Sequence, residues 1–187
     1  MALRAVPEGM RRTAELDRET DRTYFWTVNG LRILLLVLLG LLGWLVLPMA
    51  LVENGLLAAE LAVFLVGFAL CLLLTGLVRR TLMKRLSGAP ARFVWRELFP
   101  SSESAACFTP AEFCLTVCLF PAVWAAVCLT LTLCLGAAWK WVFYWLLLAD
   151  VLGFCAEIPL LAVIFRVSKR ALLRDRESVL EVYSDEE

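Results

Sequence analysis

Histidine is absent from the whole sequence of 187 residues. A chain without imidazole cannot use a histidine general base, a Ser-His or Cys-His pair, or a metal site that needs a histidine ligand. Charged residues are also scarce, at 19% against about 25% in an ordinary soluble domain. Because the net charge is zero, the overall charge gives no indication of a nucleic-acid partner, and none is expected.

The seven cysteines form no CxxC pair, so the sequence lacks the common redox and zinc motifs built on cysteine. Cys114 and Cys118 share a helix face, but two thiols without further ligands make a poor zinc site. We therefore expect no disulfide framework, no bound metal and no other cofactor.

Hydrophobic residues are abundant, at 61% of the chain. A membrane-crossing helix needs about 20 residues, and four apolar stretches reach that length. They are residues 33–51, 55–78, 113–135 and 139–165. The first is not a signal peptide, because about thirty mostly polar residues precede it and no small-residue cleavage pattern follows it. The sequence predicts an all-α integral membrane protein with four transmembrane helices and contact with the lipid bilayer.

Lysine and arginine predict the orientation of these helices, because cytoplasmic loops carry the excess of positive residues. Residues 1–32 hold six, the loop 79–111 holds six and residues 166–187 hold five, whereas the other two loops hold only Lys140. We therefore expect a cytoplasmic segment 1–32, a transmembrane domain 33–165 with a cytoplasmic loop 79–111, and a cytoplasmic tail 166–187. The expected location is the plasma (inner) membrane, with both termini inside.

The central loop contains two short β-prone runs, at residues 92–95 and 105–108, separated by a stretch that includes "LFPSSES". This pattern predicts a short β-hairpin. The following "FTPAEF" predicts the start of the third helix, with Thr109 as N-cap, Pro110 at the first position and Glu112 completing a capping box. The tail, of mixed charge, is expected to be a solvated helix end followed by flexible residues.

Three acidic residues fall inside the predicted membrane helices, where charge is costly and often functional. They are Glu60, Asp150 and Glu157. Asp150 and Glu157 are seven residues apart and would share nearly the same helix face. Glu157 would lie about 12 Å from the cytoplasmic end of its helix. It is expected either to pair with Arg79 on the second helix or to stay protonated and bond a backbone carbonyl.

From the second helix onward, the chain resembles the zincin-type membrane peptidases, a largely uncharacterised family of bacterial membrane proteins. The segment "TGLVRRTLMKRLSG" (75–88) has the rhythm of the HExxH helix of that family, with Thr75 and Arg79 at the two histidine positions and Gly76 at the glutamate. The segment from Asp150 to Tyr183 is similar to the family's last helix and tail, where Glu157 falls at the position of an acidic metal ligand. The resemblance covers about residues 70–183.

The departure from HExxH decides what this resemblance implies. Two histidines on one helix face bind zinc, and the glutamate deprotonates the zinc-bound water. Threonine is a poor zinc ligand, arginine stays cationic, and glycine provides no base. The zinc site cannot form with Thr75, Gly76 and Arg79, so an active metallopeptidase is not expected. Arg79 would instead place a fixed positive charge where the metal stood and give Glu157 an ionic partner.

The sequence thus predicts a non-catalytic binding or regulatory protein that resembles a zincin peptidase and uses the old substrate cleft, with the central loop as recognition surface. Its partner would be a membrane protein or peptide. The alternative is a small ion-coupled or proton-coupled transporter or channel component that uses Asp150 and Glu157, and this would require an oligomer to enclose a path. An enzyme with other chemistry is less favoured, because no nucleophile has a visible base.

Overall fold

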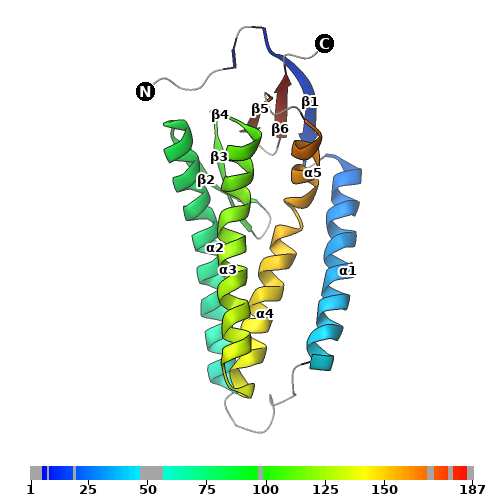
Figure 1. The fold of residues 1–187 in the computed structure, drawn as a ribbon, viewed down its shortest axis with the longest axis vertical. Coiled ribbons are helices and arrows are strands. Elements are labelled where there is room, and N and C mark those ends of the chain that lie inside the picture. The colour runs from blue at the N-terminus through cyan, green and yellow to red at the C-terminus, as the bar shows by residue number, and fades with distance from the viewer. Residues whose placement is uncertain are drawn as a thin grey trace.

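The computed structural model describes residues 6–7, 9–18, 20–46, 57–96, 99–167, 171–176 and 179–184 (Figure 1). Five helices occur within these ranges: α1 (Arg22–Val46), α2 (Leu57–Ser87), α3 (Pro110–Cys134), α4 (Ala137–Phe154) and α5 (Ile158–Arg166). The strands within them are β1 (Arg11–Asp17), β2 (Ala91–Arg96), β3 (Phe99–Ser104), β4 (Cys107–Phe108), β5 (Leu172–Arg176) and β6 (Val179–Ser184).

Three of the helices, α1, α2 and α3, are long and apolar enough to cross a membrane by themselves. The bent pair α4 and α5 passes the same test when taken as one span. Many large apolar side chains on α1, α2 and α3 are exposed, as expected where lipid covers them. The prediction of a mostly helical protein with three to four helices of membrane-spanning length and composition is confirmed. Helix α1 begins at Arg22, well before the predicted start at Ile33.

The predicted fourth helix is not continuous. Helix α4 ends at Phe154, α5 begins at Ile158, and the two helices differ in direction by 47°. Pro159 occupies the first turn of α5, where it has no N–H to give to the preceding turn and its ring clashes with a carbonyl there. Proline therefore explains a break that the apolar run of the sequence concealed.

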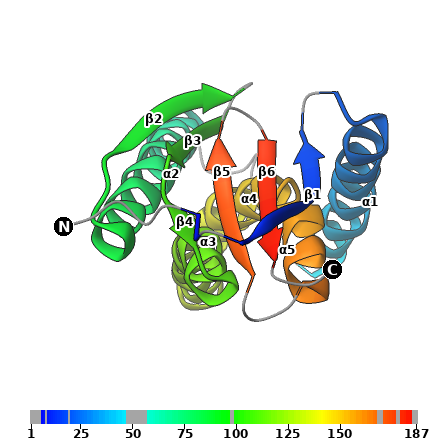
Figure 2. The ribbon, with the colours of Figure 1, turned by 90° about the horizontal axis from the view of Figure 1, so that it is seen from above.

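The all-α fold class is wrong, because a four-stranded antiparallel sheet lies across one end of the helices (Figures 1 and 2). Its strand order is β1-β6-β5-β4. The tail, expected to be a helix end, supplies the β5–β6 hairpin, and the segment before α1 supplies β1. The physical reason is the alternation of side chains along a strand. Every second residue of β5 and β6 is buried, including Leu173, Leu180 and Val182, and the residues between them are only half-buried.

The predicted hairpin of the central loop exists, but its second strand is misplaced. Strand β2 pairs with β3, whose sequence "FPSSES" was taken for the connection. The run at 105–108 instead contributes β4, which pairs with β5. Ser102 is fully buried and hydrogen-bonded, so tertiary contacts, which a propensity scale does not include, place this polar segment in a strand.

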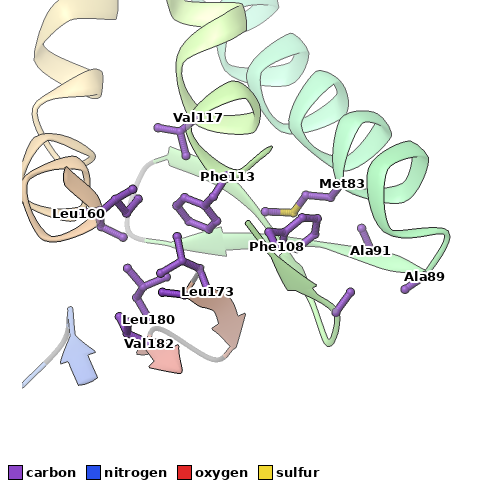
Figure 3. Packing of buried hydrophobic residues seen from close by; sticks show 13 residues of the cluster. Met83, Ala89, Ala91, Phe108, Phe113, Val117, Leu160, Leu173, Leu180 and Val182 are labelled. Atoms are coloured by element: carbon purple, nitrogen blue, oxygen red, sulfur yellow. The ribbon is translucent and has the colours of Figure 1, made fainter. Parts of the chain in front are cut away.

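The hydrophobic core of this end fills the space between the sheet and the ends of the helices. Figure 3 shows Phe113 of α3 and Leu160 of α5 pointing toward Leu173 and Leu180 of the sheet. Phe108 and Met83 extend the same cluster toward α2. The start of α3 is fixed as predicted, because Thr109 and Glu112 form the reciprocal capping box. The sheet and the ends of the helices therefore share one hydrophobic cluster.

Candidate functional site

Thr75, Gly76 and Arg79, which the sequence resemblance singled out, lie on α2, in the part of the helix that approaches the sheet. Arg79 is buried, Thr75 is half-buried and Gly76 is buried. The Thr75 hydroxyl donates to the Cys71 carbonyl of its own helix at 2.7 Å. Arg79 and Gly76 also form contacts with other elements of the fold.

Arg79 holds two carboxylates at once. Its Nη1 lies 2.8 Å from Glu157 Oε1, and its Nη2 lies 3.0 Å from Asp175 Oδ2. The predicted Arg79–Glu157 ion pair is therefore present. The Arg79 guanidinium also stands 5.9 Å from the ring centre of Phe113, within the range of a cation–π contact. Side-chain exposures of 6% for Arg79 and 0% for Asp175 place these charges away from solvent, where an unpaired ion would be very costly.

Asp175 extends the cluster to the segment before α1. The second oxygen of its carboxylate, Oδ1, accepts from Arg18 Nη2 at 2.9 Å. Burial by itself lowers the pKa of Arg18, but Asp175 and then Glu157 raise it, and the net pKa is above the ordinary value. We call Arg18, Arg79, Glu157 and Asp175 the buried charge cluster. It joins the end of β1, α2, the α4–α5 break and β5.

Asp175 and Arg18 were missed from the sequence. Asp175 lies 96 residues beyond Arg79, on a segment that was expected to be helical and solvated. A signal was present, because "LLRDR" and "VLEVYS" alternate in the way that a half-buried hairpin does. In that alternation Asp175 falls on the same face as Leu173, and a carboxylate on a buried face needs a cation.

The central hairpin covers Gly76. A Cβ atom added at this glycine would overlap the ring of Phe93 on β2. The Gly76 carbonyl accepts from the Ser102 hydroxyl of β3 at 2.9 Å. Gly76 is thus in contact with a side chain of the hairpin and has no room for a larger residue unless Phe93 moves.

Helix α1 satisfies carbonyls that the α4–α5 break leaves without helical partners. The Tyr24 hydroxyl donates to the Ala156 carbonyl at 2.7 Å, and Arg32 Nε donates to the Leu152 carbonyl at 3.3 Å. Backbone groups freed at membrane depth are tolerated where a neighbouring helix provides such partners. The break is therefore a supported feature that sets the position of Glu157.

The other two acidic candidates lie apart from the cluster. Asp150 is buried on α4, and its Oδ1 lies 3.8 Å from the Cys71 sulfur. Because the helix breaks between them, Asp150 and Glu157 do not share one continuous helix face, and that prediction is wrong. Glu60 is buried in the first turn of α2, at the opposite end of that helix from the sheet.

An apolar groove of about 400 Å³ lies between α2, α3 and α4. Gly67, Trp124 and Leu146 are among its lining residues, which all lie in the half of these helices away from the sheet. The groove therefore does not coincide with Arg79 and Glu157. Over the described ranges of the chain, no three cysteine, aspartate or glutamate side chains are grouped closely enough to hold a metal ion.

No family model, curated protein or solved structure matches this chain.

Proposed function

We propose that this chain is a non-catalytic multi-pass membrane protein, built on a scaffold similar to that of the zincin-type membrane peptidases of bacteria. In this proposal Arg79 takes the place of the metal, and the protein has a binding or regulatory role toward a membrane protein or peptide. It resides in the plasma (inner) membrane with the sheet and both termini in the cytoplasm.

The observation that carries the proposal is the pairing of Arg79 with Glu157 and Asp175. A fixed cation held by two carboxylates compensates their negative charge, as a bound metal ion would otherwise do. The contact between Gly76 and Phe93 adds support, because it fills the position at which a catalytic base would act. Because side chains of this protein fill the site around Gly76 and Arg79, we place partner binding on the sheet and the hairpin rather than in an open cleft.

A transporter or channel has less support. Its path would need Asp150 and Glu157 in succession, but the α4–α5 break separates them, and Glu157 is committed to Arg79.

The test is the metal content of the detergent-purified protein by mass spectrometry, after zinc loading and washing. We expect well under one zinc per chain for the natural sequence. The variant that restores both histidines, Thr75→His with Arg79→His, should retain zinc through Glu157 and lose it when Glu157→Ala is added. Near one tightly bound zinc in the natural chain, lost on Glu157→Ala, would refute the loss of the metal site. A folded double-histidine variant without zinc would refute the zincin-like scaffold.

A further inference from the structure

Helix α2 continues past its long apolar stretch and ends in exposed cations. Arg80, Lys84 and Arg85 are all exposed, and the last two lie in the final turn of the helix. None of the three forms an ion pair with a carboxylate in the part of the chain that the structure describes. The Arg80 Nε atom donates to the Ala91 carbonyl at 3.1 Å, which ties this exposed side chain to the start of β2.

The position of these cations relative to lipid follows from the same helix. Large apolar side chains form one exposed stripe along α2, at intervals of three or four residues: Val66, Leu70, Leu73 and Leu77. Continuing the same intervals leads to Arg80 and then Lys84. The face of α2 that meets acyl chains therefore becomes cationic within one turn.

The length of helix that carries the three cations matches the thickness of a headgroup layer. Arg80 to Arg85 covers about 7 Å of helix, at 1.5 Å per residue. The polar headgroup regions add about 5 to 8 Å on each side of the hydrocarbon core. The three cations thus span the layer where phospholipid phosphates lie, directly above a stripe that contacts the tails of the same lipids.

We infer that Arg80, Lys84 and Arg85 form a binding surface for the headgroup of an anionic phospholipid in the leaflet next to the sheet. Charge complementarity selects the ligand, because the phosphate of a zwitterionic lipid is compensated within its own headgroup. The apolar stripe selects a membrane lipid over a free anion. The inference does not use the loss of the metal site, so either proposal can fail without the other.

The experiment titrates the detergent-purified full chain with phosphatidylglycerol and, separately, with phosphatidylcholine, and counts bound lipids by native mass spectrometry. We expect tighter binding of phosphatidylglycerol to the natural chain. The variant Lys84→Gln with Arg85→Gln should weaken this binding, by up to about fivefold for each cation removed, and adding Arg80→Gln should weaken it further. Higher salt should reduce the preference in the natural chain, because these cations are exposed.

The matched control is Arg11→Gln with Arg22→Gln, which removes two exposed cations, from β1 and from the start of α1, that form no ion pair within the described residues. It should keep the preference, and so should the swap Lys84→Arg with Arg85→Lys. Equal losses in both neutralised variants, or no preference in the natural chain, would overturn the inference. Inorganic phosphate is added as a competitor at equal concentration. Displacement of the lipid by phosphate would also overturn the inference, because the cations would then be a general anion site.

Discussion

At the scale of single residues, the buried charge cluster alternates in sign: Arg18, Asp175, Arg79 and Glu157 form a chain in which each inner member touches two partners. Two positive and two negative charges cancel. Such a cluster contributes little net stability, because removing the ions from water costs about as much as their attraction returns. It is nevertheless intolerant of change, since the loss of one member leaves an opposite charge buried without compensation.

The first prediction concerns the pair at the centre of the cluster. Arg79→Gln should destabilise the protein by about 3 to 5 kcal/mol, because it leaves Glu157 without its cation and leaves Asp175 with Arg18 alone. Glu157→Gln should cost less, since its side chain is 20% exposed. The double variant should be more stable than the sum of the two losses predicts, which denaturant unfolding in detergent can measure. Arg80→Gln, which removes an exposed neighbour without an ion pair, is the control. Strictly additive losses would show that the pair is not coupled.

Sequence reasoning reached the Arg79–Glu157 pair because both residues are costly in a membrane and their helical depths agree. It did not reach Asp175 or Arg18. Their partners depend on strand pairing between segments that are distant in the chain, and neither hydropathy nor helical periodicity reports such pairing.

At the scale of elements, the long helices were predictable, whereas the short strands and the break were not. A run of about 20 apolar residues has few alternatives to a spanning helix, because lipid offers no hydrogen bonds to an open backbone. The capping box before α3 was also found, since its signal is local. Strand β3 was missed because its serine-rich sequence has low β propensity, and its place depends on the packing of the hairpin against α2.

The second prediction tests how the hairpin is seated on α2. Gly76→Ala should be destabilising by about 1 to 3 kcal/mol, because the new methyl group overlaps the Phe93 ring. Adding Phe93→Leu should recover part of the loss by vacating that space. Hydrogen exchange of the β2 amides should rise in the single variant and fall back in the double variant.

Gly40 provides the matched control on α1, because a Cβ added there meets no atom within 4 Å. Gly40→Ala should leave the stability unchanged or raise it by about 0.5 to 1 kcal/mol, as expected for a helix interior. If Gly76→Ala behaved like Gly40→Ala, the close contact between the hairpin and α2 would be refuted.

At the scale of the whole molecule, the sheet constrains how the chain crosses the membrane. Strand β1 precedes α1, β4 lies between α2 and α3, and β5 follows α5, yet all three belong to one sheet. The chain must therefore return to the same side after α1 and α2, and again after α3, α4 and α5. Figure 1 shows this sheet at one end of the helices. An even number of crossings follows from strand pairing, independently of the positive residues.

The third prediction tests the proposed direction with cysteine labelling. Cys134 is exposed at the end of α3 away from the sheet, so a membrane-impermeant maleimide added outside intact cells should label it. Cys107 lies buried in β4, and burial raises the pKa of its thiol, which leaves little reactive thiolate near neutral pH. It should react only after denaturation.

Variants that keep only Cys134 or only Cys107 allow the labelling of the two thiols to be compared, with the mass shift as the measurement. Labelling of Cys134 only after the inner face is opened would reverse the orientation.

The pairing of β1 with β6 also sets an order of events during synthesis. The ribosome makes β1 before any of the helices, but β6 emerges only after all of them have been made. Until then Arg18 has no Asp175 to bind, and Arg79 has only Glu157. The sheet therefore closes as a late step. Premature termination after α5 would leave a chain with all its helices, with β1 unpaired and with Arg18 lacking its carboxylate partner, which is the kind of species that proteases remove.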